Sequence, residues 1–170
     1  MDEKVIYYIQ KLKLQRHPEG GYFNEIYRSG EIFEASVLPE RYNGSRAFST
    51  SIYFLLEGKQ FSSFHKIQSD EIWHFYVGSP VKIFIITHEG KIEEKILGND
   101  LHKNENLQII VEKNNWFAAE LKDKTSFALV GCTVAPGFSF EDFEMSDRNK
   151  LLKDYPEHSE IILRLTKAKA

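Results

Sequence analysis

The sequence has little cysteine, no excess of positive charge and no long hydrophobic run. Its 170 residues include one cysteine, Cys132, so neither an intrachain disulfide nor a zinc site built from several cysteines can form. The 22 basic and 25 acidic residues leave a formal net charge of -3, so the chain lacks the excess of positive charge that is typical of nucleic-acid-binding proteins. No apolar stretch reaches the roughly 18 residues of a membrane-spanning helix, and the charged start MDEKVIYYIQ lacks the layout of a signal peptide. We therefore expect a cytoplasmic protein without a nucleic-acid or membrane partner.

Motifs for nucleotide binding and for nucleophilic hydrolysis are also absent. The sequence contains no P-loop, no dinucleotide fingerprint and no G-x-S-x-G nucleophile elbow. Cys132 lies inside the apolar run FALVGCTV, which favours an inert buried thiol over a reactive one.

The chain does contain many short apolar segments separated by turn residues. An amphipathic helix is expected from Val5 to Leu12, before the proline and glycines of HPEGG break it. The expected strands are 22–29, 48–56, 61–65, 71–77, 81–87, 91–97, 107–111, 116–121 and 127–134. Two helices follow, at 147–153 with Ser146 as the N-cap and at 158–165. Short strands with helices only at the ends predict a single all-β domain, a sandwich or barrel, over residues 1–170.

One stretch, HKIQSDEIWHFYVG, combines strand alternation with ionisable side chains. His65 and Ile67 share one strand face, and Glu71 and Trp73 are expected to face the same interior from the next strand. His74 then points to the opposite face. An imidazole and a carboxylate on one wall can bind a metal ion or transfer a proton. The alternative is a buried pair that only holds two strands together.

Other polar residues on the expected strands are further candidates for ligand contact. Glu25 and Arg28 share one strand, and strict alternation would place only one of them inside. Gln108 is a candidate pocket amide. The candidate proton donors are Tyr22, Tyr27, Tyr53 and Tyr76. His17 and His102 lie in expected loops, and nothing in their spacing points to a site. Each of these residues is alternatively an ordinary surface or interface residue.

The central stretch resembles the first motif of the cupin superfamily, G-x5-H-x-H-x3-E-x6-G. His65, Glu71 and Gly78 match this motif at the right spacing, and Ile67 stands in the place of its second histidine. The second motif, P-x-G-x2-H, falls best on EKNNWFAAEL, where Phe117 takes the place of the histidine. The resemblance thus leaves two of the four ligands of a cupin metal site, and we expect no stably bound divalent metal at His65 and Glu71.

Longer segments are similar to the Cupin 5 family. They are HPEGGYFNEIYRS, STSIYFLLEG, SDEIWHFYVGSPV, WFAAE and GCTVAPGFSFEDFEM, and they occur in that family's order from Leu14 to about Met145. The resemblance implies a double-stranded β-helix, that is, a jelly roll, over residues 14–145, with a C-terminal helical segment at 146–170. It also implies a homodimer, in which YFNEIYRS is the candidate strand for crossing to the partner sheet.

Two functions from different classes remain open at this point. The first is a protein that binds a small polar metabolite, for example a sugar or sugar nucleotide, in the jelly-roll cavity. Its expected ligand contacts are Glu25, Arg28, Trp73 and Gln108. The second is a metal-independent isomerase or epimerase, similar to the cupin-fold sugar-nucleotide epimerases. In that enzyme His65 would be the base, with Glu71 orienting its ring.

Overall fold

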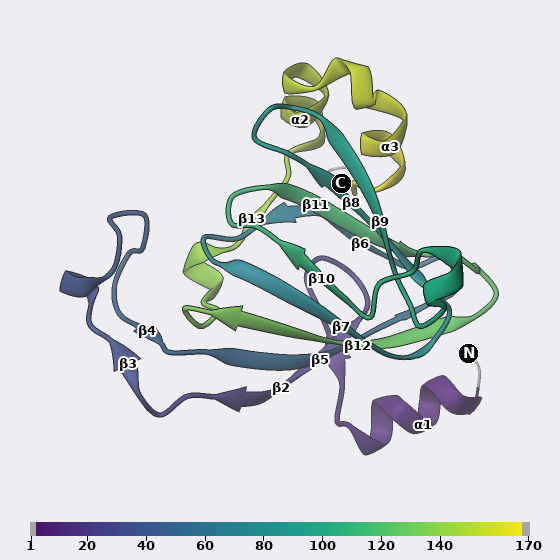
Figure 1. Cartoon of the computed structure of the whole chain (residues 1–170), viewed down its shortest axis with the longest axis horizontal. Coiled ribbons are helices and arrows are strands. Elements are labelled where there is room, and N and C mark those ends of the chain that lie inside the picture. The colour runs from purple at the N-terminus through teal and green to yellow at the C-terminus, as the bar shows by residue number, and fades with distance from the viewer. Residues whose placement is uncertain (1–2, 168–170) are drawn as a thin grey trace.

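Two antiparallel β-sheets pack face to face in the computed structural model, which describes residues 3–167 (Figure 1). The larger sheet has the order β1 (Gln15–Arg16), β2 (Tyr22–Arg28), β5 (Thr50–Glu57), β12 (Phe127–Ala135), β7 (Asp70–Gly78) and β10 (Gln108–Val111). The smaller has the order β13 (Glu144–Met145), β6 (Phe61–Lys66), β11 (Trp116–Leu121), β8 (Val81–Ile86) and β9 (Ile92–Leu97). This arrangement is the jelly roll that the sequence predicts.

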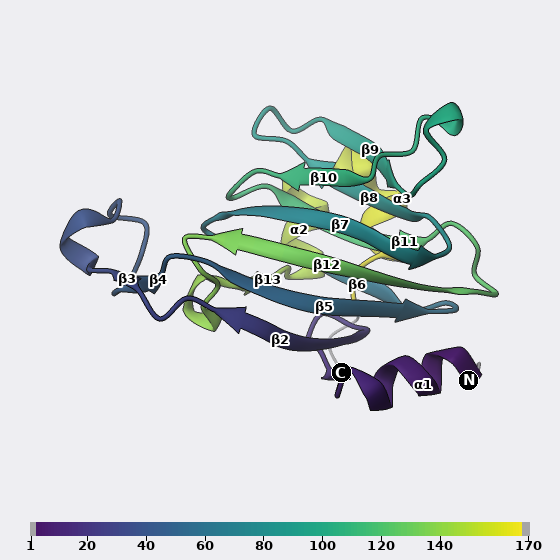
Figure 2. The ribbon, with the colours of Figure 1, turned by 60° about the horizontal axis from the view of Figure 1, so that its bottom comes forward.

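The nine strands expected from the sequence are all present, each within two residues of its expected bounds. The very short strands were not expected, because two residues carry no readable alternation. Two of them, β3 (Ile32–Phe33) and β4 (Arg46–Ala47), pair with each other and form a small sheet of their own. Together with the 3-10 helix η1 (Ala35–Val37), this sheet forms an arm that extends away from the body (Figure 2).

The main core fills the space between the two sheets. Trp73 from β7 lies between Phe54 of β5 and Phe117 of β11, with ring centroids 5.6 and 6.3 Å away. Inward residues alternate with outward ones along each strand, as the pleat of a strand requires. The strand β12 reads FALVGCTVA and lies between β5 and β7. It is buried along almost its whole length, because Ala128, Val130 and Cys132 face the core between the sheets while Phe127 and Leu129 face the cluster under the N-terminal helix.

Helices cover the outer faces of both sheets. The N-terminal helix α1 (Glu3–Lys11) packs on the larger sheet through Val5, in a cluster that includes Tyr22 and Leu129. The C-terminal helices α2 (Arg148–Asp154) and α3 (Ser159–Arg164), joined by η4 (Pro156–His158), pack on the smaller sheet. No helix among residues 3–167 is both long and apolar enough to cross a membrane.

The expected cap of α2 was wrong by one residue. Asp147, and not Ser146, occupies the N-cap position, and its carboxylate accepts the backbone N–H of Lys150 at 3.1 Å. A carboxylate suits this position because it also interacts favourably with the positive end of the helix dipole.

Candidate functional site

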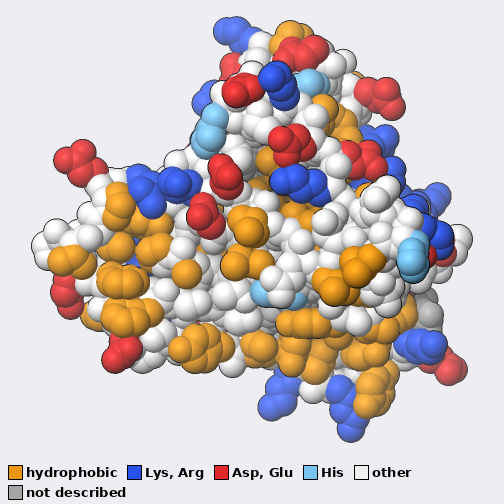
Figure 3. Space-filling view, viewed as in Figure 1, with side chains coloured by type: hydrophobic (Ala, Val, Ile, Leu, Met, Phe, Trp, Pro, Cys, Tyr) orange, Lys and Arg blue, Asp and Glu red, His pale blue; other side chains and the backbone are white. Residues whose placement is uncertain are grey.

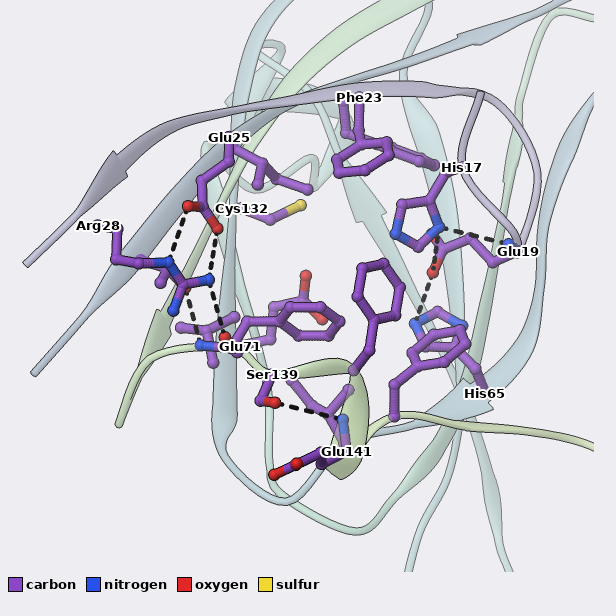
Figure 4. A pocket seen from close by; sticks show the side chains of 18 residues that line it. His17, Glu19, Phe23, Glu25, Arg28, His65, Glu71, Cys132, Ser139 and Glu141 are labelled. Carbon is purple, nitrogen blue, oxygen red and sulfur yellow. Dashed lines mark hydrogen bonds and ion pairs between the residues drawn. The ribbon is translucent and has the colours of Figure 1, made fainter. Parts of the chain in front are cut away.

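A cavity of about 340 Å³ lies between the sheets, and eighteen residues line it (Figure 4). Strands β2, β5, β7 and β12 contribute from the larger sheet, and β6 contributes from the smaller one. Two segments outside these strands close it, the loop that carries His17 and Glu19 and the segment 138–143, which includes the 3-10 helix η3 (Phe140–Asp142). Most of the remaining wall is aliphatic or phenylalanine side chains.

Two glycines bring the first of these loops against the sheets. Gly20 and Gly21 both have positive φ angles, 129° and 68°, which favour glycine. A Cβ on Gly20 would lie 2.1 Å from the carbonyl oxygen of Phe61, and one on Gly21 would lie 2.6 Å from that of Leu55. This close approach of loop backbone to strand backbone is what carries the preceding Glu19 into the interior.

Glu19 lies between two imidazoles at the inner end of the cavity. Its Oε2 is 3.1 Å from His65 Nε2 and 3.4 Å from His17 Nδ1, while its Oε1 accepts a hydrogen bond from Ser62 Oγ at 2.8 Å. The three side chains are at most 7% exposed. Burial raises the pKa of Glu19, against the opposing effects of His17 and Ser62, and it lowers the pKa values of both histidines.

Hydrogen-bond partners fix where the protons of this cluster lie. His65 Nδ1 is 2.7 Å from the carbonyl oxygen of Ser63, which can only accept, so Nδ1 carries a hydrogen. The contact between His65 Nε2 and Glu19 Oε2 therefore contains one further proton, carried either by the imidazole or by the carboxyl group. The backbone N–H of Glu19 donates to His17 Nδ1 at 3.3 Å, which places the ring proton of a neutral His17 on Nε2. That nitrogen points into the cavity (Figure 4).

Glu71 is the second buried carboxyl group and faces the cavity from β7 (Figure 4). Its pKa is raised from 4.5 to about 7, mainly by burial and also by the nearby Glu19. His65 and the Cys132 thiol oppose this shift. A carboxyl group with this pKa changes its protonation close to neutral pH, so it can both accept and donate a proton there.

Cys132 contributes a neutral thiol to the same wall. It is buried and free, and burial raises its pKa well above the ordinary value, with Glu71 acting in the same direction. The expectation of an inert thiol therefore agrees with its surroundings, although its side chain lies on the cavity wall.

Glu25 and Arg28 both line the cavity, contrary to the expectation that only one of them would. The pairing of β2 with β5 shifts between Glu25 and Tyr27, so that Ile26 is an extra residue in a β-bulge. The bulge turns Arg28 to the side of Glu25. Arg28 donates to both carboxylate oxygens of Glu25, at 2.9 and 2.7 Å, and to the carbonyl oxygen of Phe138 at 3.1 Å.

Two of the expected ligand contacts lie away from the cavity. Trp73 is 1% exposed and belongs to the core beside it. Gln108 is exposed on the outer face of β10, directly opposite His74 of β7. The reason is the register, which turns Ile109 inward opposite Trp73 and therefore Gln108 outward. His74 lies on the outer face, as expected, and its Nε2 is 3.0 Å from Thr133 Oγ1.

None of the four candidate tyrosines lines the cavity. Tyr22 is buried under α1, and Tyr53 packs against the same cluster. Tyr27 and Tyr76 are 53% and 48% exposed. The expectation of a tyrosine proton donor is therefore not supported by the positions of these side chains. His102 lies in the exposed 3-10 helix η2 (Leu101–Lys103), also outside the cavity lining.

The side chains present do not fit a cupin metal centre. Ile67 lines the cavity where the superfamily motif has a histidine, and Phe117 is fully buried against His65, with ring centroids 4.1 Å apart. Among residues 3–167, no group of three or more His, Cys, Asp and Glu side chains is arranged to hold a metal ion. His65 also has both ring nitrogens in contact with protein atoms, which leaves neither one free as a ligand.

Sequence reasoning missed Glu19 and did not single out His17. Both were read as part of a helix-breaking turn, and loop residues carry no alternation that would show which way they point. The paired glycines are the signal that could have found them, because a glycine pair often marks close backbone approach. The aromatic segment GFSFEDF serves in the sequence only as part of a family motif, although it supplies Phe138, Phe140 and Phe143 to the cavity.

Comparison with known proteins gives consistent matches over nearly the whole chain. Residues 6–146 match the family model described as Cupin superfamily (DUF985), Cupin_5. The structure is similar to protein SO0799 from Shewanella oneidensis, with a TM-score of 0.88 and 36% identity over 99% of this chain and 100% of that one. It is also similar to a hypothetical protein from Leishmania major, with a TM-score of 0.86 and 29% identity over 96% and 98% of the two chains.

A sequence relative occurs in yeast. The uncharacterized protein YML079W of Saccharomyces cerevisiae is 29% identical over 143 residues, which are 79% of this chain and 71% of the yeast protein.

Proposed function

The chain belongs to the Cupin_5 family of the cupin superfamily, and from the geometry of its cavity we propose that it binds a small polar metabolite there. The observation that carries this proposal is the cavity of about 340 Å³, with apolar walls and a few ionisable groups that converge on it. Concave, mostly apolar cavities with a small number of placed polar groups are the usual form of small-molecule sites. Glu71 and His17 Nε2 are the groups placed to contact the ligand from opposite sides.

The charge of the lining narrows the ligand class. A sugar nucleotide carries a diphosphate, which proteins hold with arginines, lysines or helix N-termini. Among the eighteen lining residues Arg28 is the one arginine, there is no lysine, and Glu25 already occupies the guanidinium. We therefore favour a metabolite without phosphate groups.

A thermal-shift screen tests the binding proposal. The library contains neutral sugars, polyols, amines, amino acids and small carboxylic acids. A ligand at about 100 times its dissociation constant adds roughly 2.7 kcal/mol to the free energy of unfolding. For a chain of this size the melting temperature should then rise on the order of 5–10 °C.

A matched pair of variants locates the binding. Glu71→Gln removes a cavity carboxyl group and should reduce the ligand-induced shift, whereas Glu112→Gln makes the same change at an exposed position outside the cavity and should not. A library without any hit, or hits that bind equally well to Glu71→Gln, would overturn the proposal.

A second candidate function is a metal-independent isomerase, and the pKa of about 7 at Glu71 favours it. The Glu71 carboxylate would accept the proton of a C–H bond beside a carbonyl, and the electron pair of that bond would form an enolate. Return of the proton to the same face of that carbon restores the substrate, and protonation of the opposite face gives its epimer. This assignment replaces His65 as the base, because Ser63 and Glu19 occupy both of its ring nitrogens.

Isotope exchange distinguishes the two functions. Each hit from the screen is incubated with the protein in deuterated water, and its C–H signals are followed by NMR. An isomerase should replace a substrate hydrogen by deuterium, and Glu71→Gln should stop that exchange. Binding without exchange for every hit leaves the binding protein as the function.

We also propose that the protein is a homodimer in the cytoplasm, as expected from the sequence. Strand β1 pairs only with Tyr22 and Phe23, so the outer edge of β2 from Asn24 to Arg28 has no partner strand among the described residues. Ile26 and Tyr27 on this strand are 48% and 53% exposed. Hydrophobic side chains also gather on the arm that carries β3 and β4 (Figure 3). An open apolar strand edge needs cover, and a second copy can supply it.

A further inference from the structure

The cavity lining has a surplus of acidic groups. Its eighteen residues include the four glutamates Glu19, Glu25, Glu71 and Glu141 and a single arginine, and of these Glu141 pairs at 3.4 Å with Arg46, which lies outside the lining. Arg28 is bound by both oxygens of Glu25 and by the carbonyl oxygen of Phe138. No cation in the lining is therefore left to meet an anionic ligand, while the Glu71 carboxyl group faces the open space (Figure 4).

Aromatic rings supply the second observation, and it is independent of the charges. Five phenylalanines line the same cavity: Phe23, Phe54, Phe138, Phe140 and Phe143. Four of them surround His17, whose ring centroid is 4.5 Å from that of Phe23 and about 6 Å from those of Phe54, Phe140 and Phe143. The fifth, Phe138, packs on Phe140 with ring centroids 5.0 Å apart. An aromatic wall of this kind suits the apolar part of a ligand, and it also tolerates a nearby organic cation because ring faces carry negative electrostatic potential.

We propose that the ligand is a small organic cation, an amine or quaternary ammonium carried on an apolar group, with its positive charge beside Glu71. This rests on the proposed function and names the ligand class for the same cavity. The phenylalanines and aliphatic residues contact the apolar group, and the Glu71 carboxylate balances the positive charge of the ligand. Arg28 and Glu25 also line the cavity, but they pair with each other and so contribute no net charge.

Proton release should accompany this binding. The ionisable and polar groups that face Glu71 are His65 from β6, Glu19 from the glycine loop, Cys132 from β12 and Trp73 from its own strand. A bound cation favours the carboxylate form of Glu71 over the protonated form. Affinity should therefore increase by up to about tenfold per pH unit below pH 7 and level off above it.

Three probes of the same size and ring test the proposal: benzylamine, benzyl alcohol and benzoate. Thermal shift and isothermal titration calorimetry are run on the full chain at pH 6, 7 and 8. Benzylamine should bind best, at least tenfold more tightly than the other two, and its affinity should rise with pH. Glu71→Gln should weaken benzylamine binding at least tenfold at pH 8, and Glu112→Gln should leave it unchanged.

The outcomes separate this proposal from the more general one. Equal or tighter binding of benzyl alcohol or benzoate overturns the cation class, and so does the failure of benzylamine to bind. If the metabolite library still yields a neutral or acidic ligand that depends on Glu71, binding by the cavity stands without the cation class. The pH dependence is measured on the unmodified protein, so the test does not depend on the folding of any variant.

Discussion

Glu71 should cost the protein stability at neutral and alkaline pH, and its replacement by glutamine should recover that stability. The pKa of Glu71 is raised to about 7 in the folded state from an ordinary value of 4.5. Between these two values the folded state holds a proton that the unfolded state has released, so the free energy of unfolding falls as pH rises. Above pH 7 both states are ionised and the loss is complete.

The size of the effect follows from the shift. Each pKa unit is worth about 1.4 kcal/mol, so a shift of about 2.5 units amounts to roughly 3 kcal/mol. Glutamine keeps the shape of the side chain and cannot ionise. Glu71→Gln should match the wild type in stability near pH 4.5 and exceed it by about 3 kcal/mol at pH 8. For a chain of 170 residues this corresponds to roughly 6–12 °C in melting temperature.

Urea titrations of both proteins from pH 4.5 to 8, followed by tryptophan fluorescence at one protein concentration, measure the difference. Taking the difference removes the titration of groups that do not contact Glu71, and Glu112→Gln shows how an exposed glutamate behaves. A difference that does not change with pH, or a variant less stable than the wild type at pH 8, would refute the reasoning that Glu71 is buried without a matched cation.

Three further outcomes concern other parts of the molecule. Arg46→Ala leaves Asp142 buried without its two hydrogen bonds of 2.7 Å and should lower the free energy of unfolding, measured by urea titration, by about 3–5 kcal/mol. The double variant Arg46→Met with Asp142→Leu should lose much less stability, and equal losses for the two proteins would contradict this. Light scattering should give about twice the chain mass of 19.8 kDa, and Tyr27→Asp should reduce it to one chain; a monomeric wild type would remove the dimer proposal. Elemental analysis of untagged protein, dialysed without chelator, should find well under one iron, manganese, nickel or zinc per chain, because Ile67 and Phe117 occupy two of the four ligand positions. A stoichiometric metal would show that other side chains complete a site.

The sequence predicted the fold well because alternation, turn residues and family motifs all pointed to the same strands. Alternation also turned His65, Ile67 and Glu71 toward one interior, and all three line the cavity, although His65 comes from the smaller sheet and Glu71 faces it from the larger one rather than from the same wall. It could not show that Glu19, and not Glu71, contacts the imidazole of His65 directly. That contact depends on how closely a distant loop approaches the strand, which strand periodicity does not encode.

Local irregularities account for most of the remaining differences. The bulge at Ile26 arises from the pairing of β2 with β5, so the sequence of β2 alone does not reveal that Glu25 and Arg28 share a side. In β10 the two adjacent isoleucines, Ile109 and Ile110, make the alternation of QIIV ambiguous. The register with β7 resolves it and turns Gln108 outward.

The position of β12 has a consequence for how the protein is made. This strand lies between β5 and β7 and is the element that joins them, yet about 80 residues are synthesised between the end of β5 and the end of β12. At the usual rate of translation of about 5–20 residues per second, the synthesis of β12 is complete roughly 4–16 s after that of β5. During that time the nascent chain exposes apolar strand edges and faces that the finished sheet buries. The ribosome-bound chain should therefore be a client of chaperones until Ala135 has emerged, and any truncation before β12 should split the larger sheet in two.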